Sequence, residues 1–177
     1  MKIALIGYSG CGKSTLAKFL GESYGIPVLY LDQIHWLSGW EEQEPQKEQA
    51  AVKEFMDRTP QWVIDGNYTS LEYERRMEEA DRILFLNFNR FVCLFRAGKR
   101  FLANRGRARE SMTKGCEEKL DWEFIWWILH DGRTKKQRDR YAQVSGRYPE
   151  KTVIIKNQKE LDAFYHKVKQ EREEKQC

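Results

Sequence analysis

A run of small and polar residues near the start of the chain has the types and spacing needed to bind phosphate groups. It comprises Gly7, Tyr8, Ser9, Gly10, Cys11, Gly12, Lys13, Ser14 and Thr15, which fit the pattern G-x-x-x-x-G-K-[ST]. The glycines allow the backbone to curl so that successive N–H groups point at phosphate oxygens. Lys13 adds a positive charge that can reach the β- and γ-phosphates, and the Ser14 hydroxyl is suited to ligate Mg²⁺. The run therefore predicts a site for ATP and Mg²⁺.

Two aspartates follow apolar runs further along the chain. Asp32 ends the run 26–31, and Asp65 ends the run 62–64. Asp32 is suited to orient or deprotonate an acceptor hydroxyl, or to hold Mg²⁺ through water. The plainer alternative is that it caps the next turn. Asp65 is predicted to be a second carboxylate near the metal, with a turn-stabilising role as an equal alternative.

The neighbours of these aspartates are candidates for binding a phosphoryl acceptor. His35 either contacts the acceptor or hydrogen-bonds between Trp36 and Trp40. We expect Trp36 and Trp40 to be core or pocket-wall residues, with stacking on a base or ring as the less favoured alternative. Asn67 offers a donor to the acceptor. We expect the acceptor side of the site to comprise Asp32, His35, Trp36, Asp65, Gly66 and Asn67.

An arginine-rich stretch offers the cations that phosphoryl transfer needs, because negative charge spreads over the phosphoryl oxygens during the reaction. The alternative is a solvated basic surface. We select Arg96 and Arg100, one helical turn apart, and Arg105 and Arg107, which flank Gly106, as catalytic residues beside Lys13 and Asp32. Residues 104–116 lack apolar periodicity and contain two glycines, which predicts a mobile lid that closes over bound ligands.

The flanking elements must place these residues on one side of the protein. Apolar runs predict strands over residues 1–6, 26–31, 62–64, 82–87 and 151–155. Helices are expected after Ser14 up to Gly21 or Gly25, and over residues 45–58, 71–79, 91–102, about 118–141 and 161–168. Strands that alternate with helices indicate a parallel sheet covered on both faces, with ligands beyond the carboxyl ends of the strands. Gly7, Asp32, Asp65 and Asn87 all fall at such ends, so we expect the site to gather them.

Two of the predicted helices carry distinct apolar faces. In the first, one face holds Phe91, Leu94, Phe95, Phe101 and Leu102, opposite Arg96 and Arg100. The second is expected to be one long helix whose apolar seam comprises Trp122, Ile125, Trp126 and Leu129, and Gly132 is expected to kink or divide it. Residues from 170 onward are charged and are expected to fray.

The composition is that of one globular domain over residues 1–177, with the lid as an insertion. The net charge of +4 suits an anionic ligand without requiring nucleic acid. The cysteines, Cys11, Cys93, Cys116 and Cys177, contain no C-x-x-C pair and suggest a reducing compartment. The sequence contains no signal peptide and no apolar run long enough to span a membrane, so we expect a cytoplasmic protein with no membrane partner.

The chain also resembles adenylate-kinase-related P-loop kinases, and more closely the bacterial group known as DNA topology modulation proteins. The matching segments are residues 6–15, 31–36 with Gly39 and Trp40, 62–68, 105–109 and 115–119 with Asp121. The resemblance implies a P-loop NTPase fold of the nucleotide-kinase type with a five-stranded parallel sheet, ATP with Mg²⁺, and an arginine-bearing lid. It departs from adenylate kinases at Asp65-Gly66-Asn67-Tyr68-Thr69, where those enzymes carry D-G-F-P-R with an arginine for the acceptor phosphate. AMP is therefore not expected to be the acceptor.

Two functions follow from these observations. The first is a kinase that transfers the γ-phosphoryl group of ATP to a small-molecule acceptor such as a nucleotide. The second is an ATP-binding regulatory protein that affects DNA topology, directly through the basic residues 90–109 or through a partner. We rank direct DNA binding well behind, because the net charge is modest and the sequence contains no helix-turn-helix or similar motif.

Overall fold

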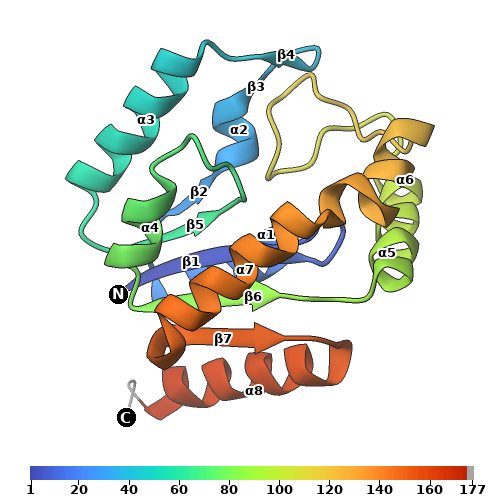
Figure 1. Ribbon diagram of the computed structural model, residues 1–177. Coiled ribbons are helices and arrows are strands. Elements are labelled where there is room, and N and C mark those ends of the chain that lie inside the picture. The colour runs from blue at the N-terminus through green and yellow to red at the C-terminus, as the bar shows by residue number, and fades with distance from the viewer. Residues whose placement is uncertain (175–177) are drawn as a thin grey trace.

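The computed structural model describes residues 1–174, and its centre is a five-stranded parallel sheet (Figure 1). The strands run in the order β2-β5-β1-β6-β7. Their bounds are β1 Lys2–Gly7, β2 Val28–Tyr30, β5 Trp62–Asp65, β6 Arg82–Leu86 and β7 Thr152–Ile155. The parallel sheet and its five strands are confirmed, and the chain has the P-loop NTPase α/β fold.

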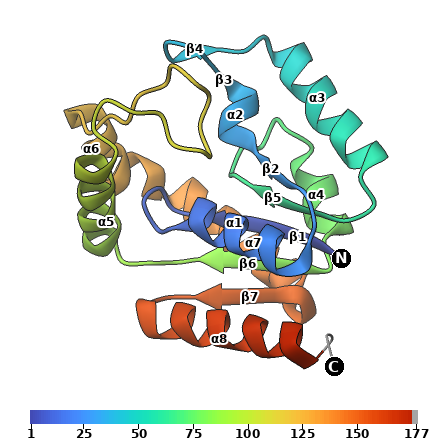
Figure 2. The same cartoon turned by 180° about the vertical axis from the view of Figure 1, so that it is seen from behind.

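Helices cover both faces of the sheet. Helix α7 lies in front of the sheet in Figure 1, whereas α1 lies in front in the reverse view of Figure 2. Helix α8 packs against α1, and Arg147 of α7 donates a hydrogen bond to Glu74 of α4. The helices are α1 Lys13–Tyr24, α2 Leu31–His35, α3 Pro45–Arg58, α4 Tyr73–Glu79, α5 Arg90–Ala103, α6 Trp122–Leu129, α7 Lys135–Arg147 and α8 Gln158–Glu174. Within residues 1–174, no helix combines the length and hydropathy that a membrane span requires.

The central strands form the core. Strands β1, β5 and β6 are buried along almost their whole length, as expected for parallel strands covered on both faces. The register pairs Leu5 with Asp65 and Gly7 with Leu86, so the carboxyl ends of these strands lie side by side. The sheet thereby brings the glycine-rich loop after β1 next to Asp65.

The expected long helix over about 118–141 is two helices, and Gly132 lies in the break. Residues Asp131–Arg133 form a turn of 3₁₀ helix between α6 and α7. The Thr134 side chain caps α7 by accepting a hydrogen bond from the N–H of Gln137. A Cβ at position 132 would lie 2.9 Å from the Trp127 carbonyl oxygen, so only glycine fits this close approach.

Three further features of the elements did not follow from the sequence. On the predicted apolar face of α5, Phe91, Phe95 and Leu102 are exposed, and the buried residues of the helix are Cys93 and Ala97. A small hairpin of β3 Trp36–Leu37 and β4 Glu41–Glu42 was not foreseen. Helix α8 continues to Glu174 rather than fraying from residue 170, and residues 175–177 lie outside the described part of the chain.

Candidate active site

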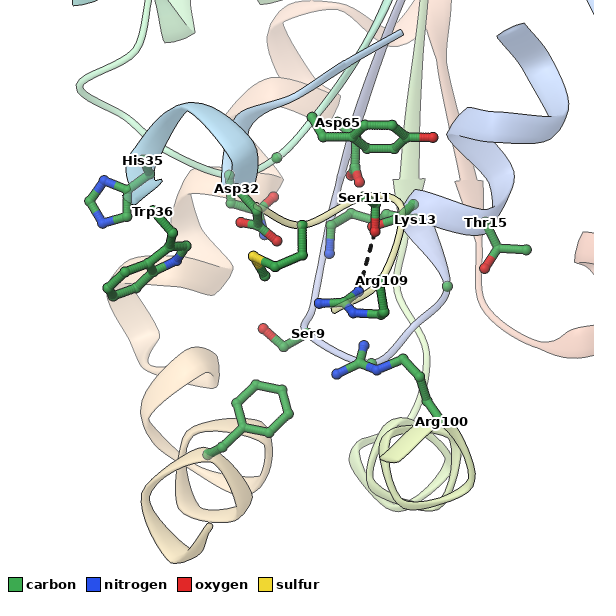
Figure 3. A pocket seen from close by; sticks show the side chains of 18 of the residues that line it. Ser9, Lys13, Thr15, Asp32, His35, Trp36, Asp65, Arg100, Arg109 and Ser111 are labelled. Atoms are coloured by element: carbon green, nitrogen blue, oxygen red, sulfur yellow. Dashed lines mark hydrogen bonds between the residues drawn. The ribbon is translucent and has the colours of Figure 1, made fainter. Parts of the chain in front are cut away.

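A cavity of about 1430 Å³ opens at the carboxyl ends of the strands. Most of the residues predicted from the sequence line it: Ser9, Gly10, Gly12, Lys13, Ser14, Thr15, Asp32, His35, Trp36, Asp65, Gly66, Asn67, Arg96 and Arg100. Residues outside its lining are considered below. Figure 3 shows how several of these side chains converge on the same space from α1, α2, β5 and α5.

The loop between β1 and α1 has the curled backbone that its sequence predicts. Gly7, Gly10 and Gly12 have φ angles of +143°, +79° and +98°, in a region that residues other than glycine rarely adopt. At Gly10 a Cβ would also lie 2.5 Å from the carbonyl oxygen of Cys93. The glycines are therefore required both by backbone conformation and by the close approach of α5.

Lys13 is held by the loop itself. Its Nζ donates a hydrogen bond to the carbonyl oxygen of Tyr8 over 3.0 Å. Burial opposes its positive charge, but the negative charges near it, including Asp65 and Asp32, outweigh burial and raise the pKa of Lys13. Lys13 is thus a charged donor at the mouth of the loop, and an incoming phosphate would compete with a single backbone carbonyl for it.

The predicted loop residues Gly7, Tyr8 and Cys11 do not line the cavity, and neither does Asn87, whose N–H donates to the Ile155 carbonyl oxygen. The Tyr8 and Cys11 side chains are buried, and the Arg133 guanidinium lies 3.7 Å from the centre of the Tyr8 ring. Arg133 belongs to the turn after α6 and also donates to the Phe88 carbonyl oxygen over 2.9 Å. It therefore connects this turn both to Tyr8 of the glycine-rich loop and to the segment after β6. Tyr8 and Cys11 therefore offer only their backbone to a ligand.

Asp65 is a buried carboxylate, and one of its oxygens accepts no hydrogen bond from the described part of the chain. It is 5% exposed, and within residues 1–174 its Oδ1 has no hydrogen-bond partner. Burial raises its pKa to about 6, although Lys13 and the Ser14 hydroxyl act in the opposite direction. A carboxylate next to a serine hydroxyl at the start of a phosphate-binding helix fits Mg²⁺. No cluster of three His, Cys, Asp or Glu side chains suited to a metal occurs among the described residues, but phosphate oxygens and waters supply most ligands of Mg²⁺ in such sites.

The loop after β5 connects both sides of the site. The Asn67 side chain accepts a hydrogen bond from the Gly7 N–H over 3.0 Å and donates to the Gly7 carbonyl oxygen. The Tyr68 hydroxyl donates to Asp32 Oδ1 over 2.9 Å. Asn67 was expected to donate to an acceptor, but its amide is occupied by the backbone that begins the phosphate-binding loop.

A buried arginine holds that loop in place. Arg76 of α4 is fully buried and donates to the carbonyl oxygens of Leu71, Gly66 and Tyr68 over 2.8, 3.0 and 2.6 Å. Burial lowers its pKa to about 10, so it remains charged at neutral pH. Carbonyl groups thus replace the carboxylate that a buried arginine usually has.

An aromatic wall lies next to Asp32. The His35 ring contacts Trp36 and Tyr68, each with ring centres 4.7 Å apart, and Trp36 packs edge-on to Trp40 at 5.5 Å. His35 Nδ1 lies 2.8 Å from Oε2 of Glu48, a buried residue of α3. This pairing holds the His35 ring in position while the ring still lines the cavity.

The arginines divide into a group that faces the cavity and a group that does not. Arg96, Arg100 and Arg109 line the cavity. Arg105 and Arg107, which were predicted to be catalytic, are exposed and lie outside the lining, because the chain beyond α5 turns them toward solvent before Arg109 returns. In this conformation Arg109, which was not selected, faces the cavity, whereas the catalytic roles of Arg105 and Arg107 stay predictions.

Glu118 brings Arg100 and Arg109 together. Its side chain is 4% exposed, and its two carboxylate oxygens lie 2.7 Å from Arg100 Nε and 2.6 Å from Arg109 Nε. Two guanidinium groups around one buried carboxylate leave a net positive charge beside Lys13 (Figure 3). Arg96 lies beneath the loop, where it donates to the Cys11 carbonyl oxygen and stacks 4.3 Å over Phe88.

The segment 104–116 crosses the cavity and is anchored at its far side. The Thr113 hydroxyl donates to the carbonyl oxygen of Trp36 over 2.5 Å, and the Gln33 side chain donates to the Glu110 carbonyl oxygen over 2.6 Å. Met112 and Cys116 are buried. The expectation that little buried surface holds this segment was therefore wrong: two isolated apolar side chains anchor it without producing a periodic pattern.

Several cavity residues were missed by the sequence analysis. The signal for Arg109 was present, since it belongs to the arginine-rich stretch, but sequence spacing does not reveal which arginines turn inward. Glu48, which contacts His35 without lining the cavity, lies four residues before Val52 on the buried face of α3, and that spacing is a signal for a buried carboxylate. Tyr68 and Glu118 lie in the matching segments 62–68 and 115–119, but those segments assigned no role to either side chain. Trp127, expected on no particular surface, lines the cavity and donates to the Ser9 hydroxyl over 3.2 Å.

Comparison with known proteins supports the fold assignment. No family model matches the sequence, and a search of curated proteins found no match. Among solved structures, shikimate kinase from Acinetobacter baumannii in complex with shikimate is 20% identical, with a TM-score of 0.58 over 96% of this chain and 90% of that chain. Deoxyadenosine kinase from M. mycoides with dCMP and dCDP is 16% identical, with a TM-score of 0.51 over 96% of this chain and 99% of that chain. At these identities the similarity demonstrates a shared fold.

Proposed function

We propose that this protein is an ATP-dependent kinase that transfers a phosphoryl group to a small molecule bearing a hydroxyl group or a phosphate. The observation that carries the proposal is the convergence of Lys13, Asp32, Arg100 and Arg109 on one cavity beyond the strand ends. A phosphate-binding loop by itself fits any nucleotide hydrolase. A carboxylate and two further arginines facing the same space fit a group transfer to a second bound molecule.

The proposed roles follow from the contacts of each residue. Lys13 and backbone N–H groups between Ser9 and Thr15 bind the phosphates of ATP, whereas the Gly7 N–H is taken by Asn67. Ser14 and Asp65, with Asp32 through water, would hold Mg²⁺, which supplies charge neutralisation at the phosphate oxygens. Arg100 and Arg109 stabilise the negative charge of the transferring group, as planar guanidinium groups do well.

Asp32 is proposed to orient the acceptor hydroxyl and to take up its proton. The Tyr68 hydroxyl donates to one carboxylate oxygen, Oδ1, and so fixes the direction in which Asp32 presents the other. Proton transfer by a positioned carboxylate typically accelerates such a step by about 10²–10⁴-fold. The bonds from Arg76 to the loop carrying Tyr68 keep this arrangement rigid.

The proposed acceptor contains a ring. His35, Trp36 and Trp40 form a wall next to Asp32 that suits the face of a base or a cyclic polyol. The solved structures that share the fold include kinases of both kinds, one bound to dCMP and dCDP and one bound to shikimate. We further propose that the chain belongs with the adenylate-kinase-related proteins of the DNA topology modulation group, on the motifs given above, although not with AMP as acceptor.

Residues 104–116 are proposed to act as the lid of a single domain. They join α5 to the acceptor side and carry Arg109 into the cavity. Amide hydrogen exchange across these residues should slow in the presence of an ATP analogue and the acceptor together. Unchanged exchange with both ligands bound would reject the lid. Protection by duplex DNA but not by nucleotide would favour the ATP-binding regulatory function in its place.

The test is a screen of ATP consumption against nucleosides, nucleotides and small cyclic metabolites. Lys13→Ala should weaken ATP binding by about 1.5–3 kcal/mol, the value of a charge-assisted hydrogen bond. Asp32→Asn should retain ATP affinity within a few-fold and lose most turnover, because the amide keeps the size of the carboxylate but not its basicity. Wild-type ATP affinity in folded Lys13→Ala protein would reject the nucleotide site, and normal turnover by Asp32→Asn would reject the proposed base.

A further inference from the structure

Helix α5 presents an apolar stripe to solvent. Phe91, Phe95 and Leu102 are 68%, 72% and 74% exposed. With Gly98 they fall at spacings of four, three and four residues, which is the repeat of the seam between two paired helices. A helix that packed only against its own domain would turn this stripe inward, whereas here Cys93 and Ala97 of the other side face the core.

Helix α6 packs against α5 and exposes two tryptophans of its own. It runs antiparallel to α5, since Arg90 near the start of α5 donates to the Leu129 carbonyl oxygen over 2.7 Å, while Arg100 stacks over Phe124. Trp122 and Trp126 are 72% and 46% exposed and stack on each other with ring centres 6.4 Å apart. We refer to the set as the outer α5–α6 face: Phe91, Phe95, Gly98, Leu102, Trp122 and Trp126.

The exposed area of this face is that of an interface. Aromatic side chains bury about 150–250 Å² each, so the exposed parts of its four aromatic residues amount to about 500 Å². This area lies in the upper part of the range for the largest apolar patch of a monomer, about 300–600 Å², and patches of that size are often functional. A standard interface takes about 800 Å² from each partner, of which somewhat more than half is apolar. The outer α5–α6 face therefore supplies the apolar area that one side of a stable dimer needs.

We infer that the outer α5–α6 face binds a second copy of this chain, with the α5 stripes of the two copies packed against each other about a two-fold axis. A stripe with the helix-pairing repeat is complementary to itself. The exposed charges of the two helices are of both signs, with Arg90 and Lys99 on α5 and Glu123 on α6, as an interface between identical surfaces requires. A nucleic acid or an anionic membrane would instead call for a surface of one sign.

Dimer formation on this face would contact the helix that carries two of the cavity arginines, α5. Arg96 and Arg100 project from the same helix into the cavity. A second copy packed on the outer side would hold this helix in place from the side that the domain leaves uncovered. The active site itself lies on the inner side and stays open, so the interface does not depend on the identity of the acceptor.

Sedimentation velocity on the full chain tests the inference. Interfaces of this size have dissociation constants of micromolar or tighter, so the wild-type protein should sediment as a dimer at about 50 µM. Phe95→Glu places a charge in the middle of the stripe of each copy and should raise the dissociation constant at least about 100-fold. Ala50→Glu is the matched control, because it adds the same charge at an exposed position of α3, on the opposite side of the molecule in both Figure 1 and Figure 2.

The outcomes separate clearly. Monomeric Phe95→Glu beside dimeric wild-type and Ala50→Glu protein supports the inference. A wild-type protein that stays monomeric at about 100 µM overturns it, as does a Phe95→Glu protein that remains dimeric. Circular dichroism verifies folding, and Leu102→Glu at the end of the stripe replaces Phe95→Glu if that variant does not fold. Binding of the wild-type monomer to vesicles would assign the face to a membrane and also overturn the inference.

Discussion

Asp65 should make the ligand-free protein less stable at neutral pH than an uncharged residue would. Its pKa is raised from 3.8 to about 6, chiefly by burial. At 1.36 kcal/mol per unit, holding the ionised form costs the folded state about 3 kcal/mol above pH 6. Asp65→Asn removes the charge and keeps the shape. Because the buried oxygen would still have no partner, part of the gain is lost, and we expect about 2 kcal/mol of added stability.

The sign of the pH dependence follows from linkage. The folded-state pKa lies above the unfolded value, so the folded protein binds more protons between about pH 4 and pH 6, and its stability falls as the pH rises through that window. The advantage of Asp65→Asn should therefore be present above about pH 6 and absent below about pH 4.

Thermal unfolding in EDTA without nucleotide measures the effect. For a chain of this size 1 kcal/mol corresponds to about 2–4 °C, so the Tm at pH 7 should rise by about 4–8 °C. Asp139→Asn, an exposed carboxylate of α7, is the control and should change stability by less than about 0.5 kcal/mol. A Tm difference that does not vary between pH 4 and pH 7, or a less stable Asp65→Asn protein at pH 7, would refute the reasoning. The stabilised variant should lose Mg²⁺-dependent turnover, which is the usual cost of removing a strained functional group.

Three further predictions concern the cavity. Arg109→Ala should lower kcat/KM by about 10²-fold or more, as loss of a donor to developing charge does, whereas Arg107→Ala should leave it within a few-fold; equal effects in steady-state kinetics would contradict the assignment of the inward-facing arginine. Tyr68→Phe should lower kcat about 10–100-fold, the value of one hydrogen bond to a charged carboxylate, with an unchanged KM for ATP; a change in KM alone would place Tyr68 in nucleotide binding. Gly115→Ala should release the far end of the lid, because Gly115 has a φ of +89° and a Cβ would overlap Ser38 Oγ; hydrogen exchange at residues 111–116 as slow as in the wild-type protein would show that the backbone adapts.

The curled glycine-rich loop and the sheet could be predicted from the sequence because both depend on local patterns. Short apolar runs that alternate with helical periodicity define a parallel sheet, and the chain order of a strand, a glycine loop and a helix requires the loop to lie at a strand end. The positions of Asp32 and Asp65 beside that loop follow from the same rule, since every carboxyl end of a parallel strand meets one edge of the sheet. No contact between distant residues had to be known.

The tertiary structure decided which side chains face the cavity at this edge of the sheet. Arg105 and Arg107 differ from Arg109 only in how far along an irregular loop each lies, and the fold turns Arg109 toward Glu118 through a contact that no local pattern encodes. Asn67 and Tyr68 are adjacent in the chain, yet one holds Gly7 and the other holds Asp32. The apolar stripe of α5 shows the same limit. Periodicity predicted that Phe91, Phe95 and Leu102 share a face, but periodicity reports only that a face is apolar, and whether it packs inward depends on what the rest of the chain places beside it.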